Sequence, residues 1–202
     1  MPKIVNHQER RKLIAAATAK LISEKGLEYA TIREVAKSIH VSRGLVVHYF
    51  TSKEDLIDTA LNWANDAYLL RVSEALRGVE GLKALLIRLE NILPINEQNR
   101  MEWRIRLQVW GRGAANPEFR KIQAERFLDA RNYFMYDLKQ AMVNGELNTT
   151  RSTEEVSKTL MAYIVGLCVT AIHDPEEYTP TKLKWAVNRY ISSIGGLLSD
   201  LE

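Results

Sequence analysis

The sequence predicts an all-α protein. Its 202 residues contain 10 glycines and 5 prolines, too few for the many turns of an all-β fold. Apolar residues recur at helical spacing along most of the chain, and residues that favour helix starts precede several of these segments. We therefore expect about nine helices, with a short N-terminal group of three followed by a larger helical body.

The first helix is expected over residues 7–25. Leu13 and Leu21 belong to an apolar stripe with helical spacing, which gives this segment one face to bury. Lys25 supplies a basic last turn, and Gly26 is the type of residue that most often follows a helix end.

Two short helices and the start of a third are expected within residues 31–54. Thr31 and Glu34 form a capping box, in which a hydroxyl and a carboxylate three residues apart satisfy each other's free backbone amides. Ser42 can cap the second short helix after a tight turn. A short helix that starts with small polar residues and packs on an apolar partner fits the DNA major groove.

The two short helices divide into an apolar face, where they cross, and a polar outer face. Gly44 costs about 1 kcal/mol of helix propensity relative to alanine, so we interpret it as allowing close backbone approach. The expected packing residues are Ile32, Val35, Ala36, Ile39, Val41, Leu45, Val46 and Phe50. The expected outer residues are Ser42, Arg43, Gly44, Val47, His48 and Tyr49.

The remaining helices are opened by further cap signals. These are Ser52 before an acidic first turn, Asn116-Pro117, the capping box Ser152–Glu155, and Thr179-Pro180. We place a boundary between a head (1–53) and a body (54–202) at the start of the long helix that follows Ser52. The expected helices are 53–76, 82–93, 100–112, 117–144, 153–172 and 180–198.

Charge is unevenly distributed along the chain. Residues 1–53 hold ten Lys and Arg against four Asp and Glu, whereas the remaining 149 residues hold 18 against 21. A basic head on a slightly acidic body is typical of a phosphate-binding unit on a neutral scaffold. An uneven charge distribution can also arise by chance, so it supports a phosphate-binding head only in combination with the two short helices of residues 31–54.

Several function classes are disfavoured. No apolar run approaches the roughly 20 residues that cross a bilayer, and the N-terminus lacks an apolar signal region, so we expect a cytoplasmic protein that does not enter membranes. Cys168 is the single cysteine and lies in an apolar run, which favours a buried thiol. The four histidines have no metal-ligand spacing, and no glycine-rich phosphate loop occurs. We therefore expect that the protein is not an enzyme and that it has no catalytic residues, no metal site and no cofactor.

The run from Thr31 to Glu54 closely resembles the helix-turn-helix of the TetR family of bacterial transcriptional regulators, and within it the choline/betaine-synthesis repressor subgroup. The resemblance implies phosphate contacts from Thr31, Ser42, Lys53 and either His48 or Tyr49. It also implies that Arg43, Gly44 and Val47 face base edges, with Arg43 pairing with guanine and Val47 touching a thymine methyl.

Each of these residues also has a purely structural interpretation. Thr31 and Ser42 are helix caps whether or not DNA is present, and His48 could be an ordinary surface histidine. Tyr49 either contacts phosphate or braces the head by packing. The basic start of the first helix either reaches flanking phosphate or forms a solvated face; its residues are His7, Arg10, Arg11 and Lys12.

The resemblance implies two further functions for the body. Family members form homodimers through their last two helices, and a two-fold axis matches a palindromic operator. The residues expected at this interface are Leu160, Ile164, Leu167, Tyr190, Ile194 and Leu197. The residues expected around a small-molecule pocket, unless they are ordinary core, are Tyr68, Trp103, Leu107, Trp110, Phe127 and Phe134.

These features favour a sequence-specific regulator that binds double-stranded DNA, most simply a repressor released by a small molecule. A choline-like effector would suit an aromatic cage with a carboxylate such as Glu90 or Glu102. Two alternatives stay open: an activator or dual regulator, and a helical ligand-binding protein that has lost DNA binding. Contact residues at the family's positions, such as Arg43, Gly44 and Lys53, argue against the second.

Overall fold

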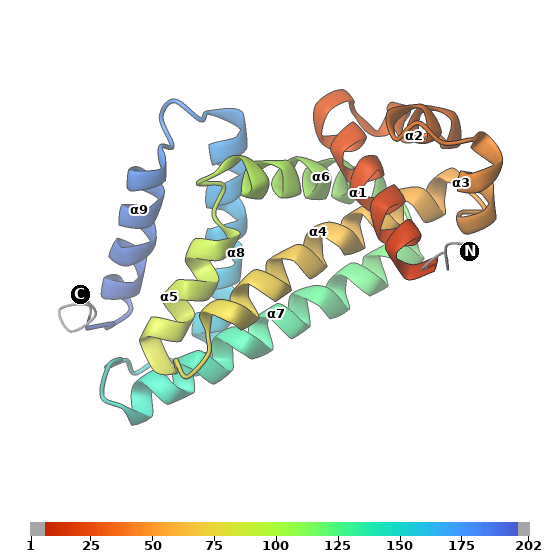
Figure 1. The fold of residues 1–202 in the computed structure, drawn as a ribbon. Coiled ribbons are helices and arrows are strands. Elements are labelled where there is room, and N and C mark those ends of the chain that lie inside the picture. Colours follow the sequence, from red (N-terminus) through yellow and green to blue (C-terminus); the bar gives the residue numbers. More distant parts are fainter. Residues whose placement is uncertain (1–6, 198–202) are drawn as a thin grey trace. The chain divides into compact units, whose positions relative to one another are not determined.

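The computed structural model describes residues 7–197, and this range consists of α-helices, one 3-10 turn and short connections (Figure 1). The prediction of an all-α chain is confirmed. The helices are α1 (His7–Lys25), η1 (Leu27–Tyr29), α2 (Ile32–Ser38), α3 (Arg43–Tyr49), α4 (Lys53–Ala75), α5 (Gly81–Ile92), α6 (Glu97–Gly113), α7 (Pro117–Val143), α8 (Thr153–His173) and α9 (Pro180–Ser193).

Side-chain caps begin the helices where the sequence indicates them. The Thr31 hydroxyl accepts a hydrogen bond from the Glu34 amide at 3.2 Å, and the Asn116 side chain accepts from the first-turn amides of α7. Ser152 and Thr179 cap α8 and α9 in the same way. Each cap satisfies an amide that has no partner inside its own helix, so local sequence suffices to fix these helix starts.

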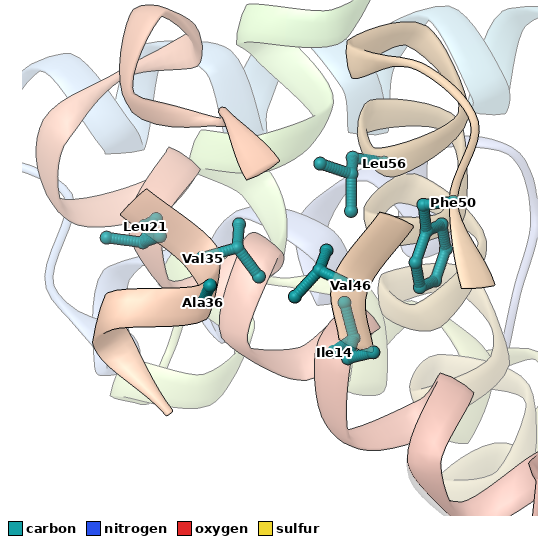
Figure 2. Packing of buried hydrophobic residues seen from close by; sticks show 7 residues of the cluster. All are labelled: Ile14, Leu21, Val35, Ala36, Val46, Phe50 and Leu56. Carbon is teal, nitrogen blue, oxygen red and sulfur yellow. The ribbon is translucent and has the colours of Figure 1, made fainter. Parts of the chain in front are cut away.

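The chain divides into two compact units. The first contains the residues up to Ala67 together with Met101–Arg112. Its core joins α1, α2, α3 and the start of α4, and Figure 2 shows the side chains that meet there. The buried residues of this cluster are Ile14, Leu21, Val35, Ala36, Val46, Phe50 and Leu56.

The first unit therefore extends beyond residue 53, where the sequence places the end of the head. Leu56 is fully buried in the same cluster as Val46, and Leu56 lies on α4. A boundary at a helix start is visible in sequence, whereas a helix whose two ends belong to different units is not. The division of DNA-binding and ligand-binding roles at residue 53 stays a prediction.

The second unit contains Tyr68–Arg100 and the residues from Gly113 onward. In this unit α7 packs against both α5 and α8. The Tyr163 hydroxyl of α8 donates to the Ala186 carbonyl of α9 at 3.0 Å, and the rings of Tyr163 and Tyr190 stack with centroids 4.4 Å apart. Burial raises the pKa of the Tyr163 hydroxyl above its ordinary value, so the group stays protonated and able to donate to a higher pH than an exposed tyrosine.

The last helix ends at Ser193, five residues before the end expected from sequence; Leu198 lies outside the described residues. Gly195 has φ +97°, and its carbonyl accepts from the Asn148 amide at 2.9 Å. A Cβ at Gly195 would lie 1.9 Å from the Asn148 carbonyl oxygen. The chain therefore turns to pair with the α7–α8 connection, which an apolar periodicity does not reveal.

Within the described residues, α8 is long and apolar enough to cross a membrane by length and composition, contrary to the expectation that no segment reaches this limit. A core helix of a soluble protein passes the same test. One third (33%) of its most apolar window is buried inside the single chain. A large part of this apolar helix thus remains uncovered by its own protomer.

Candidate functional site

Helices α2 and α3 form a tight pair within the first unit. Val35 of α2 and Val46 of α3 are completely buried between them. The connection turns at His40, whose φ of 55° is the one positive value for a non-glycine residue in the described range, and the Val41 amide then donates to the Ala36 carbonyl at 3.0 Å. This confirms the two short helices and the tight turn that the sequence predicts.

The outer face of α3 is exposed. Val47 keeps 48% of its surface accessible, although it is an apolar residue on a helix with a well-packed opposite face. The remaining exposed members of this face are Ser42, Arg43, Gly44 and His48. The face therefore presents a cation, an imidazole and an apolar side chain to whatever approaches α3.

Gly44 is not required by the fold. Its φ is not positive, and a Cβ placed on it would meet nothing nearer than the Ser42 hydroxyl oxygen at 3.9 Å. Alanine would therefore fit inside the chain and would favour the helix. Among the described residues nothing fills the space above Gly44, which is open to a molecule that approaches α3.

The predicted phosphate contacts are placed as follows. The Ser42 hydroxyl accepts from the Leu45 amide at 3.2 Å, so Ser42 and Thr31 both act as caps, and each hydroxyl keeps its own hydrogen for donation to a ligand. Lys53 is the first residue of α4 and is half-buried. The structure thus satisfies the capping interpretation and leaves donors at the starts of all three helices.

Tyr49 links the end of α3 to the start of α1. Its hydroxyl lies 3.0 Å from Nδ1 of His7, and its ring contacts the His48 ring edge to face at 5.0 Å. The His7 and His48 rings are 6.1 Å apart. Sequence reasoning named all three residues separately, but their pairing spans 42 positions and gives no local signal.

Arg11 has a structural role. Its guanidinium donates to the Tyr49 carbonyl at 2.9 Å, pairs with Asp55 at 3.2 Å, and lies 4.6 Å from the centre of the Phe50 ring. These contacts brace α1 against the end of α3 and the start of α4. The basic start of α1 is therefore partly used inside the head.

The six expected pocket residues are divided between the two units. Trp103, Leu107 and Trp110 lie on α6 in the first unit, and the rings of Trp103 and Trp110 meet edge to face at 5.7 Å. Tyr68, Phe127 and Phe134 lie in the second unit. Trp103 and Phe134 are buried and the other four are partly buried.

Both carboxylates considered for an aromatic cage have cationic neighbours. Glu90 accepts from Lys184 at 2.7 Å, and Glu102, which is 1% exposed, lies 3.6 Å from Arg106. The Arg106 guanidinium also sits 5.6 Å from the centre of the Trp103 ring. A cationic ligand at Trp103 would therefore compete with a cation that the chain supplies itself.

The expected dimer residues fall into two groups. Leu160, Ile164 and Ile194 are at most 5% exposed in the single chain, because they form part of the core of the second unit. Leu197 is 49% exposed, and Leu167 and Tyr190 are half-buried. Trp185, which lies on the same apolar side of α9 in the sequence pattern, is 62% exposed.

A buried ion pair in the second unit was also missed. Arg88 of α5 donates to Asp137 of α7, whose side chain is 1% exposed, and Arg88 lies over the ring of Tyr133 at 4.7 Å. Burial raises the pKa of the Asp137 carboxyl, while the bond from Arg88 opposes this shift. Cys168 is buried, as expected, with Sγ 4.0 Å from the Ile92 carbonyl oxygen.

Taken together, the head is a helix-turn-helix unit with a polar, exposed second helix, joined by continuous helices to a larger helical unit. This arrangement defines the class of helix-turn-helix DNA-binding proteins. Similarity to known proteins agrees. Residues 14–60 match the model "Bacterial regulatory proteins, tetR family", and residues 83–196 match "BetI-type transcriptional repressor, C-terminal".

Individual relatives extend over nearly the whole chain. The HTH-type transcriptional regulator PksA of Bacillus subtilis is 27% identical over 96% of this chain and 94% of its own length. BetI of Proteus mirabilis is 25% identical over 99% and 98%. A transcriptional regulator from Rhodococcus sp. Rha1 has a crystal structure with a TM-score of 0.78, at 31% identity over 91% of this chain and 95% of that one.

A further solved structure shows the same fold. It is a transcriptional regulator from Saccharomonospora viridis in complex with choline, with a TM-score of 0.84, 21% identity, and coverage of 92% and 97%. The chain belongs to the TetR family of bacterial transcriptional regulators and carries a BetI-type C-terminal domain. The resemblance seen in residues 31–54 is thereby confirmed and extended to the body.

Proposed function

We propose that this regulator is a homodimeric repressor that reads operator DNA with α3 and leaves it when a small molecule binds the body. The observation that carries the DNA-reading role is the outer face of α3, where Gly44 leaves open space that the fold itself does not need. Gly44 is the second residue of α3, and glycine favours a helix less than alanine does, so an external contact best explains it.

The roles along α3 follow from side-chain chemistry. Arg43 can donate two parallel hydrogen bonds to guanine in the major groove, and exposed Val47 offers an apolar contact for a thymine methyl. Thr31, Ser42 and Lys53 supply donors for phosphates at three helix starts. His48 is exposed and is a further candidate for a phosphate contact, whereas the Tyr49 hydroxyl already contacts Nδ1 of His7.

The dimer is supported by α8 and α9. The most apolar window of α8 is 33% buried within one chain, and Trp185 of α9 is 62% exposed. A second copy of the same surface would cover both and would relate the two recognition helices by a two-fold axis. Because Leu160, Ile164 and Ile194 belong to the protomer core, we place the interface on Leu167, Trp185, Tyr190 and Leu197 instead.

Choline is the first effector to test, since a neighbour with the same fold was solved with choline bound. The ion pair between Glu102 and Arg106 affects which class of effector can bind near Trp103. Choline would have to displace the Arg106 guanidinium from the Trp103 face, whereas an anionic effector would pair with Arg106. Betaine, which carries both charges, is the matched second probe.

The test is fluorescence anisotropy with DNA from upstream of the encoding gene, a scrambled duplex as control, and a salt series. Tight binding that discriminates the two duplexes and weakens steeply with salt is expected of a sequence-specific regulator. Choline and betaine are then titrated into the complex, and release by either identifies the effector class. No binding to any duplex at low salt would leave the alternative, a ligand-binding protein without DNA affinity.

An activator or dual regulator is the second candidate, because the sign of regulation depends on where the operator lies relative to the promoter. A reporter gene behind the bound DNA separates the two. Deletion of the regulator raises reporter output if it represses and lowers it if it activates.

A further inference from the structure

One side chain on α6 makes hydrogen bonds to two backbone groups at the end of α1, the Ile22 carbonyl and the Leu27 amide. The amide Nε2 of Gln108 donates to the Ile22 carbonyl at 2.8 Å, and its Oε1 accepts from the Leu27 amide at 2.9 Å. Ile22 and Leu27 flank the break at Gly26, where α1 ends and η1 begins. The contacts span 86 and 81 positions in the sequence.

Glutamine is specific for this arrangement. It carries a donor and an acceptor on the same planar group, whereas glutamate only accepts and lysine only donates. Lysine would leave the Leu27 amide without the acceptor that Gln108 supplies, and glutamate would place a carboxylate oxygen against the Ile22 carbonyl, which already accepts from the Gly26 amide. The two hydrogen bonds therefore hold the end of α1 more specifically than apolar packing would.

Two more contacts hold the same part of α6 within the first unit. Arg112 donates to Glu54 of α4 at 2.9 Å, and Arg106 donates to the Ala64 carbonyl of α4 at 3.4 Å. Hydrogen bonding within its own first turn and the nearby Arg112 keep the pKa of the Glu54 carboxyl below its ordinary value. The last three turns of α6 are thus joined to α1 and to α4.

The first turn of α6 is joined to the second unit instead. Asn99, which is 3% exposed, donates to the carbonyls of Asn91 and Leu93 at 3.0 and 2.7 Å, and Arg100 donates to the Pro94 carbonyl at 3.2 Å. One continuous helix therefore has its start anchored to the end of α5 and its end anchored to the DNA-binding head.

Movement at the end of α1 reaches α3 through the head core. Ile14 and Leu21 of α1 share one buried cluster with Val35 of α2 and Val46 of α3 (Figure 2). Because such cores are close-packed, α1 cannot shift without α2 and α3 shifting or repacking. Gln108 of α6 bonds to the end of α1, the helix that contributes Ile14 and Leu21 to this cluster.

We propose that Gln108 is the positioning residue that couples the state of the body to the DNA-binding head, through its paired hydrogen bonds to Ile22 and Leu27. This inference rests on the proposed DNA-binding function. Coupling is reciprocal: if an effector in the body weakens DNA binding, bound DNA weakens effector binding by the same free energy, so bound DNA must also act on the body. DNA itself therefore serves as the probe, and no effector is needed.

The experiment compares the unmodified chain with Gln108→Met, which keeps the side-chain length and removes both hydrogen bonds. Gln140→Met on α7, also partly buried, is the matched control. DNA affinity is measured by anisotropy, and hydrogen–deuterium exchange of residues 91–100 is measured with and without DNA. Circular dichroism and thermal melting verify that each variant is folded.

In the unmodified chain and in Gln140→Met, DNA is expected to slow exchange in residues 91–100. In Gln108→Met, affinity falls by about fivefold or more, the low end of typical coupling, and residues 91–100 no longer respond to bound DNA. If Gln108→Met does not fold, Gln108→Glu decides, because it keeps the acceptor for Leu27 and loses the donor to Ile22.

The contrary outcomes are distinct. The coupling role alone is overturned if residues 91–100 of Gln108→Met still respond normally to bound DNA; Gln108→Glu is judged in the same way if Gln108→Met does not fold. It is also overturned if the unmodified chain binds DNA and residues 91–100 do not respond. Failure of the unmodified chain to bind DNA overturns the proposed function and the coupling role together. A merely structural Gln108 would lower thermal stability and leave the response of residues 91–100 intact.

Discussion

At the scale of single residues, Gly44 and Arg43 separate function from folding most clearly. Both lie on the exposed face of α3, and within residues 7–197 neither has a contact that would explain its presence there. Caps such as Thr31 and Ser42 serve the fold in any case, so their substitution tests both roles at once.

Gly44→Ala is expected to stabilise the head and to weaken DNA binding. Alanine should raise the free energy of unfolding by up to about 1 kcal/mol, because it is the better helix former and the chain leaves room for its methyl group. The added Cβ obstructs close approach to DNA. Urea unfolding and anisotropy measure the two effects.

Gly111→Ala is the matched control, since Gly111 of α6 is also helical with open space around it. This control should gain stability and keep its DNA affinity. Equal DNA affinity in Gly44→Ala would contradict the role assigned to the α3 face.

Arg43→Ala is expected to cost about 1–3 kcal/mol of DNA binding and to relax the preference at one base position, as loss of a bidentate guanine contact does. Lys20→Ala removes the same charge from an exposed position on α1 and is the control. Binding to a panel of single-base operator variants measures both. A uniform loss across the panel would assign Arg43 to phosphate.

At the scale of helices, the sequence predicted what neighbouring residues determine. The caps at Thr31, Asn116 and Ser152 and the break at Gly26 depend on chemistry within a few positions, and these helix limits agree with the structure. The end of α9 was misplaced, since Gly195 turns to pair with Asn148, almost fifty residues earlier.

Contacts between distant helices could not be predicted. Gln108 and Arg88 have no local signal in the sequence, and Arg11 was expected to contact phosphate or solvent, yet each has partners on another element. An apolar stripe also does not distinguish core from interface, which is why Leu160 and Ile164 were assigned to a dimer surface. Only the folded chain shows that they are already covered.

The Arg88–Asp137 pair between α5 and α7 yields a test of this account of the second unit. Asp137→Ala should lower the free energy of unfolding by about 3–5 kcal/mol, because it leaves a largely buried guanidinium without its carboxylate. Replacing both, as Arg88→Met with Asp137→Leu, should recover most of that loss.

Urea unfolding measures these variants, with Lys158→Ala as a control that breaks an exposed ion pair on α8 and should change nothing measurable. If the double variant were as unstable as Asp137→Ala, the loss would come from packing around the pair and the ionic explanation would fail.

At the scale of the whole molecule, the account requires two copies. Trp185→Glu should convert the dimer to a monomer, because it places a carboxylate in an apolar two-fold contact; light scattering after size exclusion measures the mass. Tyr136→Glu alters a comparably exposed aromatic residue of α7 and should leave the dimer intact. A Trp185→Glu dimer would place the interface elsewhere.

The central claim is that two copies of α3 read a two-fold DNA site, and hydroxyl-radical footprinting on the bound upstream DNA tests it most directly. The account predicts two protected patches related by two-fold symmetry, with centres one helical turn (about 10 base pairs) or a multiple of it apart. A single patch, or uniform protection without sequence preference, would contradict it.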